Sequence, residues 1–149
     1  MLMNLNIVKA TKSDSNFIFE LALHLSNKEI LNAENFLVFY EAVIDSGFSD
    51  VFIITVDAKK AGYALLNRSA MLRYRGECVE IEEIVVAPQY RNRGIGGKFI
   101  QLLKKYYAKD QKVRKIAIKT DDVQGSVRLY ERFFDKTKMI HFQKYLNQA

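Results

Sequence analysis

The stretch Ile81–Leu103, IEEIVVAPQYRNRGIGGKFIQLL, joins three different sequence patterns. The β-branched residues before Pro88 predict a strand, and Pro88 is expected to end it. Three glycines and three Lys or Arg residues follow within the eight residues Arg91–Lys98. The stretch therefore predicts a strand, a cationic glycine loop and then an amphipathic helix. The helical face consists of apolar residues with a 3.6-residue period, namely Ile95, Phe99, Leu102, Leu103 and Tyr106.

The apolar positions of the strand change from odd to even numbers at Glu82–Glu83. A regular strand would turn one of the two apolar sets away from the core. One extra residue at Glu82–Glu83, a β-bulge, restores the register. The alternative is that Val85 belongs to the inner set and that both faces of the strand are buried. The two sets are Val79 and Ile81 before the change, and Ile84 and Val86 after it.

The glycine loop matches neither of two common phosphate-binding patterns. The dinucleotide pattern G-x-G-x-x-G fits Gly94 and Gly96 but meets Phe99 at its last glycine. The P-loop fails because Asn92 replaces its first glycine and Phe99 replaces its hydroxyl residue. Backbone N–H groups at a helix N-terminus still form an anion site, and a pyrophosphate would suit it. The alternative is a tight turn that carries surface charge.

Positive charge is a local property of this region. The formal charge is +6, and nine of the 23 Lys and Arg residues lie between Gln89 and Lys115, with only one of the 17 acidic residues. Such a cluster fits an anion site for the phosphates of a small molecule or for nucleic acid. It also fits a solvated helix face.

The remaining composition indicates one domain over residues 1–149. The longest apolar runs are far too short to span a membrane, and the N-terminus lacks the apolar segment of a signal peptide. The single cysteine, Cys78, has no disulfide partner and no company of metal ligands. We therefore expect a cytoplasmic protein without a metal or a membrane partner.

The whole chain predicts a mixed α/β sheet in the order β-α-α-β-β-β-α-β-α-β. Besides the central helix, helices are expected after Ser13 or Asp14, from Ala33 to Gly47, and after Asp121 or Asp122. Strands are expected over residues 5–11, 50–57, 61–70, 77–88, 113–120 and 138–146.

The stretch Ile81–Leu103 resembles the acetyl-coenzyme A motif of the GNAT superfamily of N-acetyltransferases. That motif is a bulged strand, a Gln/Arg-x-x-Gly-x-Gly/Ala loop and a helix, and the loop here reads Arg91-Asn92-Arg93-Gly94-Ile95-Gly96. SVRLYERFF, Ser126–Phe134, is similar to the family's second motif. The resemblance implies a GNAT-like fold, with a mixed, mostly antiparallel sheet whose bulged central strand is splayed from its neighbour and flanked by helices. It also implies acetyl-coenzyme A as co-substrate, and no metal.

The resemblance implies a role for each part of the motif. Main-chain groups of the bulged strand would pair with the pantetheine arm, and the basic helix would face the ADP 3′-phosphate. Ser126 would either touch the pantetheine or pack. The strand residues are Ile84, Val85 and Val86, and the pyrophosphate would be bound by Arg91, Asn92, Arg93, Gly94, Ile95 and Gly96, with Gly97 and Lys98 nearby.

Acetyl transfer requires a base for the ammonium, a donor for the oxyanion and an acid for the thiolate. Both Glu82 and Glu83 lie at the expected bulge. In some members of the family that the motif resembles, a glutamate at the position of Glu82 acts as the base, which makes Glu82 the first candidate and Glu83 the second. The alternative is an acidic surface patch with Glu77 and Glu80, which would attract a cationic amine. The backbone N–H of Val85 or of Val86 could support the oxyanion.

Tyr130 aligns with the tyrosine that protonates the thiolate in the family, although it also lies on the apolar face of its helix. His141 is expected on a polar sheet face. The second motif departs from the family where Val123 replaces an asparagine and Phe134-Asp135 replaces Gly-Phe. These changes put a side-chain contact to the coenzyme and the turn into the last strand in question.

We therefore expect direct acetyl transfer to a primary amine on a small molecule, such as a polyamine, aminoglycoside, aminophosphonate or amino sugar. A protein lysine or N-terminus is the alternative acceptor. A non-catalytic coenzyme A-binding protein and a nucleic-acid-binding module are the alternatives from other classes. If the protein transfers acetyl groups to a small amine, no nucleic-acid partner is expected. A homodimer is compatible with the sequence.

Overall fold

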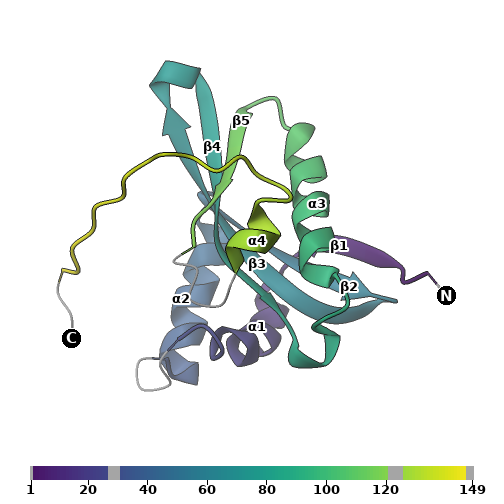
Figure 1. The fold of residues 1–149 in the computed structure, drawn as a ribbon. Helices are drawn as coiled ribbons and strands as arrows, with labels where there is room; N and C mark the ends of the chain where they lie inside the picture. The colour runs from purple at the N-terminus through teal and green to yellow at the C-terminus, as the bar shows by residue number, and fades with distance from the viewer. Residues whose placement is uncertain (1, 27–30, 121–125, 147–149) are drawn as a thin grey trace.

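The computed structural model describes residues 2–26, 31–120 and 126–146, and these form one five-stranded sheet with helices on both faces (Figure 1). The strands lie in the order β1-β2-β3-β4-β5, and every neighbouring pair is antiparallel except the parallel pair β4–β5. The strand bounds are β1 Leu5–Lys9, β2 Ser49–Val56, β3 Lys59–Met71, β4 Gly76–Val86 and β5 Val113–Ile118.

Two hydrophobic clusters occupy the two faces of the sheet. Helices α1 and α2 cover one face, and α3 covers the other, with the short α4 in front of it (Figure 1). The helix bounds are α1 Ser15–Ala22, α2 Ala33–Asp45, α3 Ile95–Ala108 and α4 Ser126–Tyr130, and short 3-10 turns cover Lys12–Asp14, Leu72–Tyr74 and Pro88–Tyr90. No described helix is long and apolar enough to cross a membrane.

Helix ends follow from local chemistry. The Asn32 side chain caps α2 by accepting a hydrogen bond from the Asn35 N–H at 3.0 Å. The same helix stops before Gly47, whose φ of +70° is the left-handed conformation that glycine adopts readily. Asp14 accepts a hydrogen bond from the Thr11 N–H at 2.8 Å and precedes the first residue of α1. The expected caps at Asp121 or Asp122 lie outside the described residues.

The register of β3 and β4 confirms the predicted bulge. Leu66 is opposite Ile81 and Leu65 is opposite Glu83, so Glu82 has no residue opposite it. The extra residue brings both apolar sets of the strand to the same face, where they join the cluster under α3.

The pairing of β4 with β5 ends just before the bulge, where β5 itself ends. Their pairing runs from Glu77 opposite Val113 to Ile81 opposite Ile118. Strand β4 then continues to Val86 along β3 alone among the described residues. One edge of β4 is therefore open over its last five residues, next to the glycine loop.

The predicted last strand is wrong for the described residues, because 135–146 contain neither helix nor strand. Figure 1 shows this C-terminal arm, in yellow, leaving the body of the molecule after α4. Its apolar side chains alternate as expected, yet Ile140 is 77 % and Phe142 88 % exposed. Alternation produces a strand only where a neighbouring strand supplies hydrogen bonds and a covered face, and the arm lies against neither.

Candidate active site

The glycine loop forms the N-terminus of α3. Gly94 caps the helix with a φ of +74°, and Asn92 has a φ of +61°. The Lys98 N–H donates to the Gly94 carbonyl at 3.1 Å, which closes the first helical turn. The N–H groups of Ile95, Gly96 and Gly97 consequently have no acceptor within the helix. These donors, together with the helix dipole, can bind an anion at this point.

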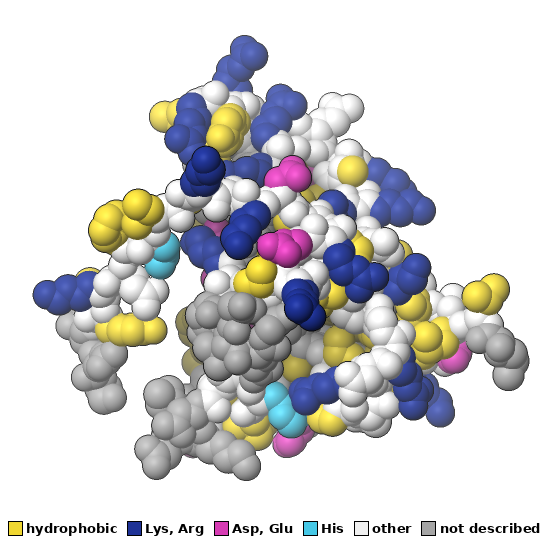
Figure 2. Space-filling model, viewed as in Figure 1, with side chains coloured by type: hydrophobic (Ala, Val, Ile, Leu, Met, Phe, Trp, Pro, Cys, Tyr) yellow, Lys and Arg dark blue, Asp and Glu magenta, His cyan; other side chains and the backbone are white. Residues whose placement is uncertain are grey.

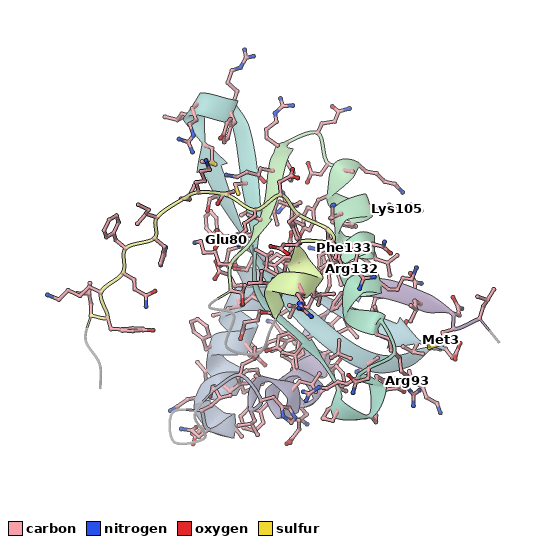
Figure 3. All side chains as sticks on the ribbon, in the orientation of Figure 1. Met3, Glu80, Arg93, Lys105, Arg132 and Phe133 are labelled. Carbon is pink, nitrogen blue, oxygen red and sulfur yellow. The ribbon has the colours of Figure 1, made fainter. Side chains whose placement is uncertain are left out.

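Only part of the positive charge lies near this loop. Figure 3 shows Arg93 beside the loop and Lys105 toward the far end of α3. At a rise of about 1.5 Å per residue, Lys105 is about 15 Å along the axis from the first residue of the helix. Lys104 donates to the Phe133 carbonyl at 2.6 Å and so contacts the segment that follows α4. The cations close to the loop are thus Arg91, Arg93 and Lys98.

Gly97 has a packing role. A Cβ atom at this position would lie 3.0 Å from Cζ of Phe133, whereas one at Gly96 would have no atom closer than 3.9 Å. Figure 3 shows Phe133 next to α4, in front of α3. Glycine at position 97 therefore lets the segment after α4 approach α3 closely.

The open edge of β4 presents alternate main-chain groups. The Ala87 N–H donates to the Ala61 carbonyl at 2.7 Å. Hydrogen-bonded pairs alternate along an antiparallel ladder, so Val85 bonds toward β3, whereas Ile84 and Val86 direct their polar groups away from it. The Val86 carbonyl accepts a hydrogen bond from Arg91 Nε at 3.0 Å. Of the three residues expected to pair with pantetheine, two thus face the open edge.

Glu83 and Glu82 differ in environment although they are neighbours. Glu83 is partly buried beside Tyr63, whose hydroxyl donates to Glu83 Oε1 at 3.4 Å. Burial raises the pKa of Glu83, the hydrogen bond from Tyr63 opposes this shift, and the charge of Glu82 adds to it. Glu82, the bulge residue, is exposed. The second candidate base therefore has the environment that is typical of a proton acceptor.

The other two glutamates do not join an acidic substrate patch. Glu77 pairs with Arg68 at 2.6 Å, and Glu80 pairs with Lys119 at 2.7 Å. Their charge is thus largely compensated by these cations, which weakens the alternative based on a cluster of four free carboxylates. Cys78 between them is a free, buried cysteine.

Tyr130 is the last residue of α4 and lines the same cavity as Glu82 and Glu83. Burial raises the pKa of its hydroxyl, so this group keeps its proton at neutral pH and can act as a donor. Ser126, at the start of the helix, shares a hydrogen bond of 2.6 Å with the Thr120 hydroxyl. This geometry does not bring Ser126 into the residues that line the cavity.

The cavity has a volume of about 1170 Å³ and opens between α1, α2, β4 and α4. His141 of the C-terminal arm lines it instead of lying on a sheet face, and its Nε2 is 3.2 Å from Gln143 Oε1. Among the described residues, no group of three His, Cys, Asp or Glu side chains could hold a metal ion.

Sequence reasoning missed the wall that α2 contributes to this cavity. Phe39 of α2 is 71 % exposed and lines the cavity, whereas Tyr40 of the same helix is buried. The available signal was the width of the apolar surface. Phe36, Leu37, Val38 and Phe39 are consecutive, and one core-facing stripe cannot accommodate all of them.

Comparisons with known proteins agree with this geometry. The model of the Acetyltransferase (GNAT) family matches residues 17–135. No curated protein sequence matches the chain.

Several solved structures share the fold over nearly the full length. A possible acetyltransferase from Clostridium difficile 630 is 16 % identical with a TM-score of 0.80, covering 96 % of this chain and 99 % of its own. Glucosamine-6-phosphate N-acetyltransferase from Arabidopsis thaliana is 23 % identical with a TM-score of 0.75, covering 97 % and 99 %. An aminoglycoside acetyltransferase from an uncultured soil metagenomic sample is 16 % identical with a TM-score of 0.77, covering 96 % and 97 %. At these identities the likeness establishes the fold.

Proposed function

The chain belongs to the GNAT acetyltransferase family, and we propose that this acyltransferase moves an acetyl group from acetyl-coenzyme A directly to a primary amine. One observation carries the proposal. The bulged β4 continues past the end of β5 toward the glycine cradle of α3, which leaves an opening along its unpaired edge, and Glu83 and Tyr130 line one cavity beside this opening.

The residues around the opening fit a coenzyme with a pyrophosphate and an amide-containing arm. The N–H groups of Ile95 to Gly97 supply donors for the pyrophosphate, and a Cβ at Gly94 would meet no atom within 4 Å, so space is available there. Arg91, Arg93 and Lys98 supply charge for the phosphates. Main-chain groups of Ile84 and Val86 at the open edge of β4 can pair with the arm as an added strand would.

Three groups of this chain carry out the two proton transfers and stabilise the developing negative charge. Bound acetyl-coenzyme A supplies an activated acetyl group as a thioester. Glu83 accepts the proton of the amine, directly or through water, because its raised pKa makes it a better base than an exposed glutamate. The Val86 N–H donates to the carbonyl oxygen as negative charge develops on it. Tyr130 donates its proton to the departing thiolate.

Glu82 remains the alternative base. It lines the same cavity, but it is more exposed than Glu83 and does not share the hydrogen bond from Tyr63.

The acceptor class is a small-molecule primary amine. Two of the structural neighbours carry names that specify glucosamine-6-phosphate and aminoglycoside acetylation. A third neighbour is named as a ribosomal-protein-alanine N-acetyltransferase, so protein N-termini are the alternative acceptor that the assay must include.

The test is an assay of free thiol release from acetyl-coenzyme A with a panel of primary amines, followed by mass spectrometry of the products. We expect amine-dependent thiol release and an acetylated amine. Tyr130→Phe should lower kcat about 100-fold while the melting temperature changes little. Coenzyme binding without acetylation of any amine or peptide would contradict catalysis, and acetylation confined to protein or peptide amines would contradict the small-molecule acceptor.

A further inference from the structure

Helices α1 and α2 form one wall of the cavity. This wall is almost entirely apolar and takes no part in the proposed proton transfers. Phe39 and Leu25 are 71 % and 52 % exposed although both side chains line the cavity. Large apolar side chains in contact with water gain free energy when a ligand covers them. The wall comprises Ile18, Ala22 and Leu25 from α1 and the turn after it, and Phe36, Phe39 and Val43 from α2.

Tyr40 and Tyr63 also line this side of the cavity, and they present aromatic surface to it because their hydroxyls are bonded to other groups of the protein. The Tyr40 hydroxyl donates to the Thr11 carbonyl at 2.7 Å, outside the cavity lining. The Tyr63 hydroxyl donates to Glu83. Tyr40 also stacks on Phe36, with ring centres 5.8 Å apart. Both hydroxyls are thus engaged, and the apolar part of each ring is what an acceptor would contact on this wall.

Charged side chains lie at the other end of the cavity. Two described lysines line it, Lys119 and Lys136, and both have carboxylate partners. Lys119 is 2.7 Å from Glu80, and Lys136 is 3.8 Å from Glu131. The described lining from α1, α2 and β3 contains no Lys or Arg. A phosphate or another anionic group on the acceptor would therefore find no cation along this wall.

We propose that the acceptor is a small primary amine that carries an uncharged aromatic or branched aliphatic group. This group packs against the wall from α1 and α2, while the amine reaches Glu83 at the base of the same cavity. The inference rests on the proposed acetyl transfer. It disfavours a phosphorylated sugar or an extended polyamine as the acceptor, because neither would cover the apolar wall.

The experiment compares matched amines in the thiol-release assay. 2-Phenylethylamine and 2-cyclohexylethylamine carry the apolar group, ethylamine lacks it, and glucosamine 6-phosphate and spermidine represent the polar acceptors. We expect kcat/KM for both ring-bearing amines to exceed that for ethylamine by about 30-fold, the size expected when an apolar group of this volume is buried. Glucosamine 6-phosphate and spermidine should be poorer substrates than either.

Two variants locate the effect. Phe39→Ala should reduce the ratio of kcat/KM between 2-phenylethylamine and ethylamine by about 5- to 10-fold, because it removes the most exposed ring of the wall. Phe48→Ala is the matched control, since Phe48 is 74 % exposed and does not line the cavity, and its ratio should equal that of the unchanged protein.

The outcomes separate the two proposals. Acetylation of ethylamine, spermidine or glucosamine 6-phosphate with no advantage for the ring-bearing amines would overturn this inference and leave acetyl transfer standing. A ratio equally lowered by Phe39→Ala and Phe48→Ala would also overturn it. No calorimetric binding of acetyl-coenzyme A would contradict the proposed function itself.

Discussion

Glu83 and Glu82 are adjacent on β4, but only Glu83 loses part of its contact with water. Both carboxylates line the cavity, but Glu83 is the one that accepts a hydrogen bond from Tyr63. The sequence predicts the bulge at this pair with Glu82 as the first candidate base, whereas the partial burial of Glu83 favours the opposite order. Moving the extra residue by one position exchanges the faces of the two side chains.

Glu83→Gln should lower kcat/KM about 100-fold near pH 7, where the amine substrate is protonated and needs a base. The deficit should shrink as the pH approaches the pKa of the amine, because the substrate then deprotonates in solution. Since Glu83 must be ionised to act and its pKa is raised, the rate of the unchanged protein should fall with decreasing pH earlier than for an exposed glutamate. Steady-state rates across pH measure both effects.

Glu82→Gln is the control for this substitution and should change the profile little. If Glu82→Gln lost the activity and Glu83→Gln kept it, the base would be the bulge residue.

Gly96 and Gly97 allow a second test with residues of the same helix. Replacing glycine by alanine inside a helix normally stabilises a protein by about 0.5–1 kcal/mol. Gly96→Ala has room for its Cβ, but Gly97→Ala would place one 3.0 Å from Phe133. Thermal melts should therefore give Gly96→Ala a melting temperature higher than Gly97→Ala by several degrees. Equal melting temperatures would show that Phe133 yields without cost and that position 97 does not need glycine.

At the scale of elements, local patterns predicted those parts of the fold that local chemistry determines. The phase change in β4, the proline that ends it and the period of α3 each specify their element without reference to distant residues. The strand predicted for the C-terminal arm was wrong for the opposite reason. Alternating apolar residues show which side chains would face a sheet if the segment paired with one. Whether a sheet edge is available depends on the path of the chain after α4.

The arm contributes little to the stability of the described fold, because the large apolar side chains of residues 139–146 are at least 71 % exposed. A chain that ends after Thr137 should therefore keep its melting temperature within about 2 °C of the full chain. Light scattering should also give both chains the same oligomeric state. A large loss of melting temperature, or a dimer that becomes a monomer on truncation, would show instead that the arm packs on a sheet edge in solution.

At the scale of the whole molecule, the positive charge is distributed rather than gathered in one band. Figure 2 shows Lys and Arg side chains over much of the visible face, with acidic side chains among them. Sequence counting found the excess between Gln89 and Lys115 but could not tell which cations lie near the loop. Helix geometry separates them, since Lys105 and Lys109 are carried about 15 to 20 Å away from the cradle. The charge available at the loop itself is therefore that of Arg91, Arg93 and Lys98.

The central claim concerns the unpaired edge of β4 beyond the end of β5 and the N-terminus of α3, and calorimetric titration with acetyl-coenzyme A tests it most directly. Dephospho-coenzyme A and the Arg93→Ala variant serve as comparators, with circular dichroism to confirm that each protein is folded. The account predicts saturable binding with a Kd on the order of micromolar, and weaker binding when either the 3′-phosphate or the Arg93 side chain is removed. A folded protein that releases no heat of binding with acetyl-coenzyme A would contradict the account.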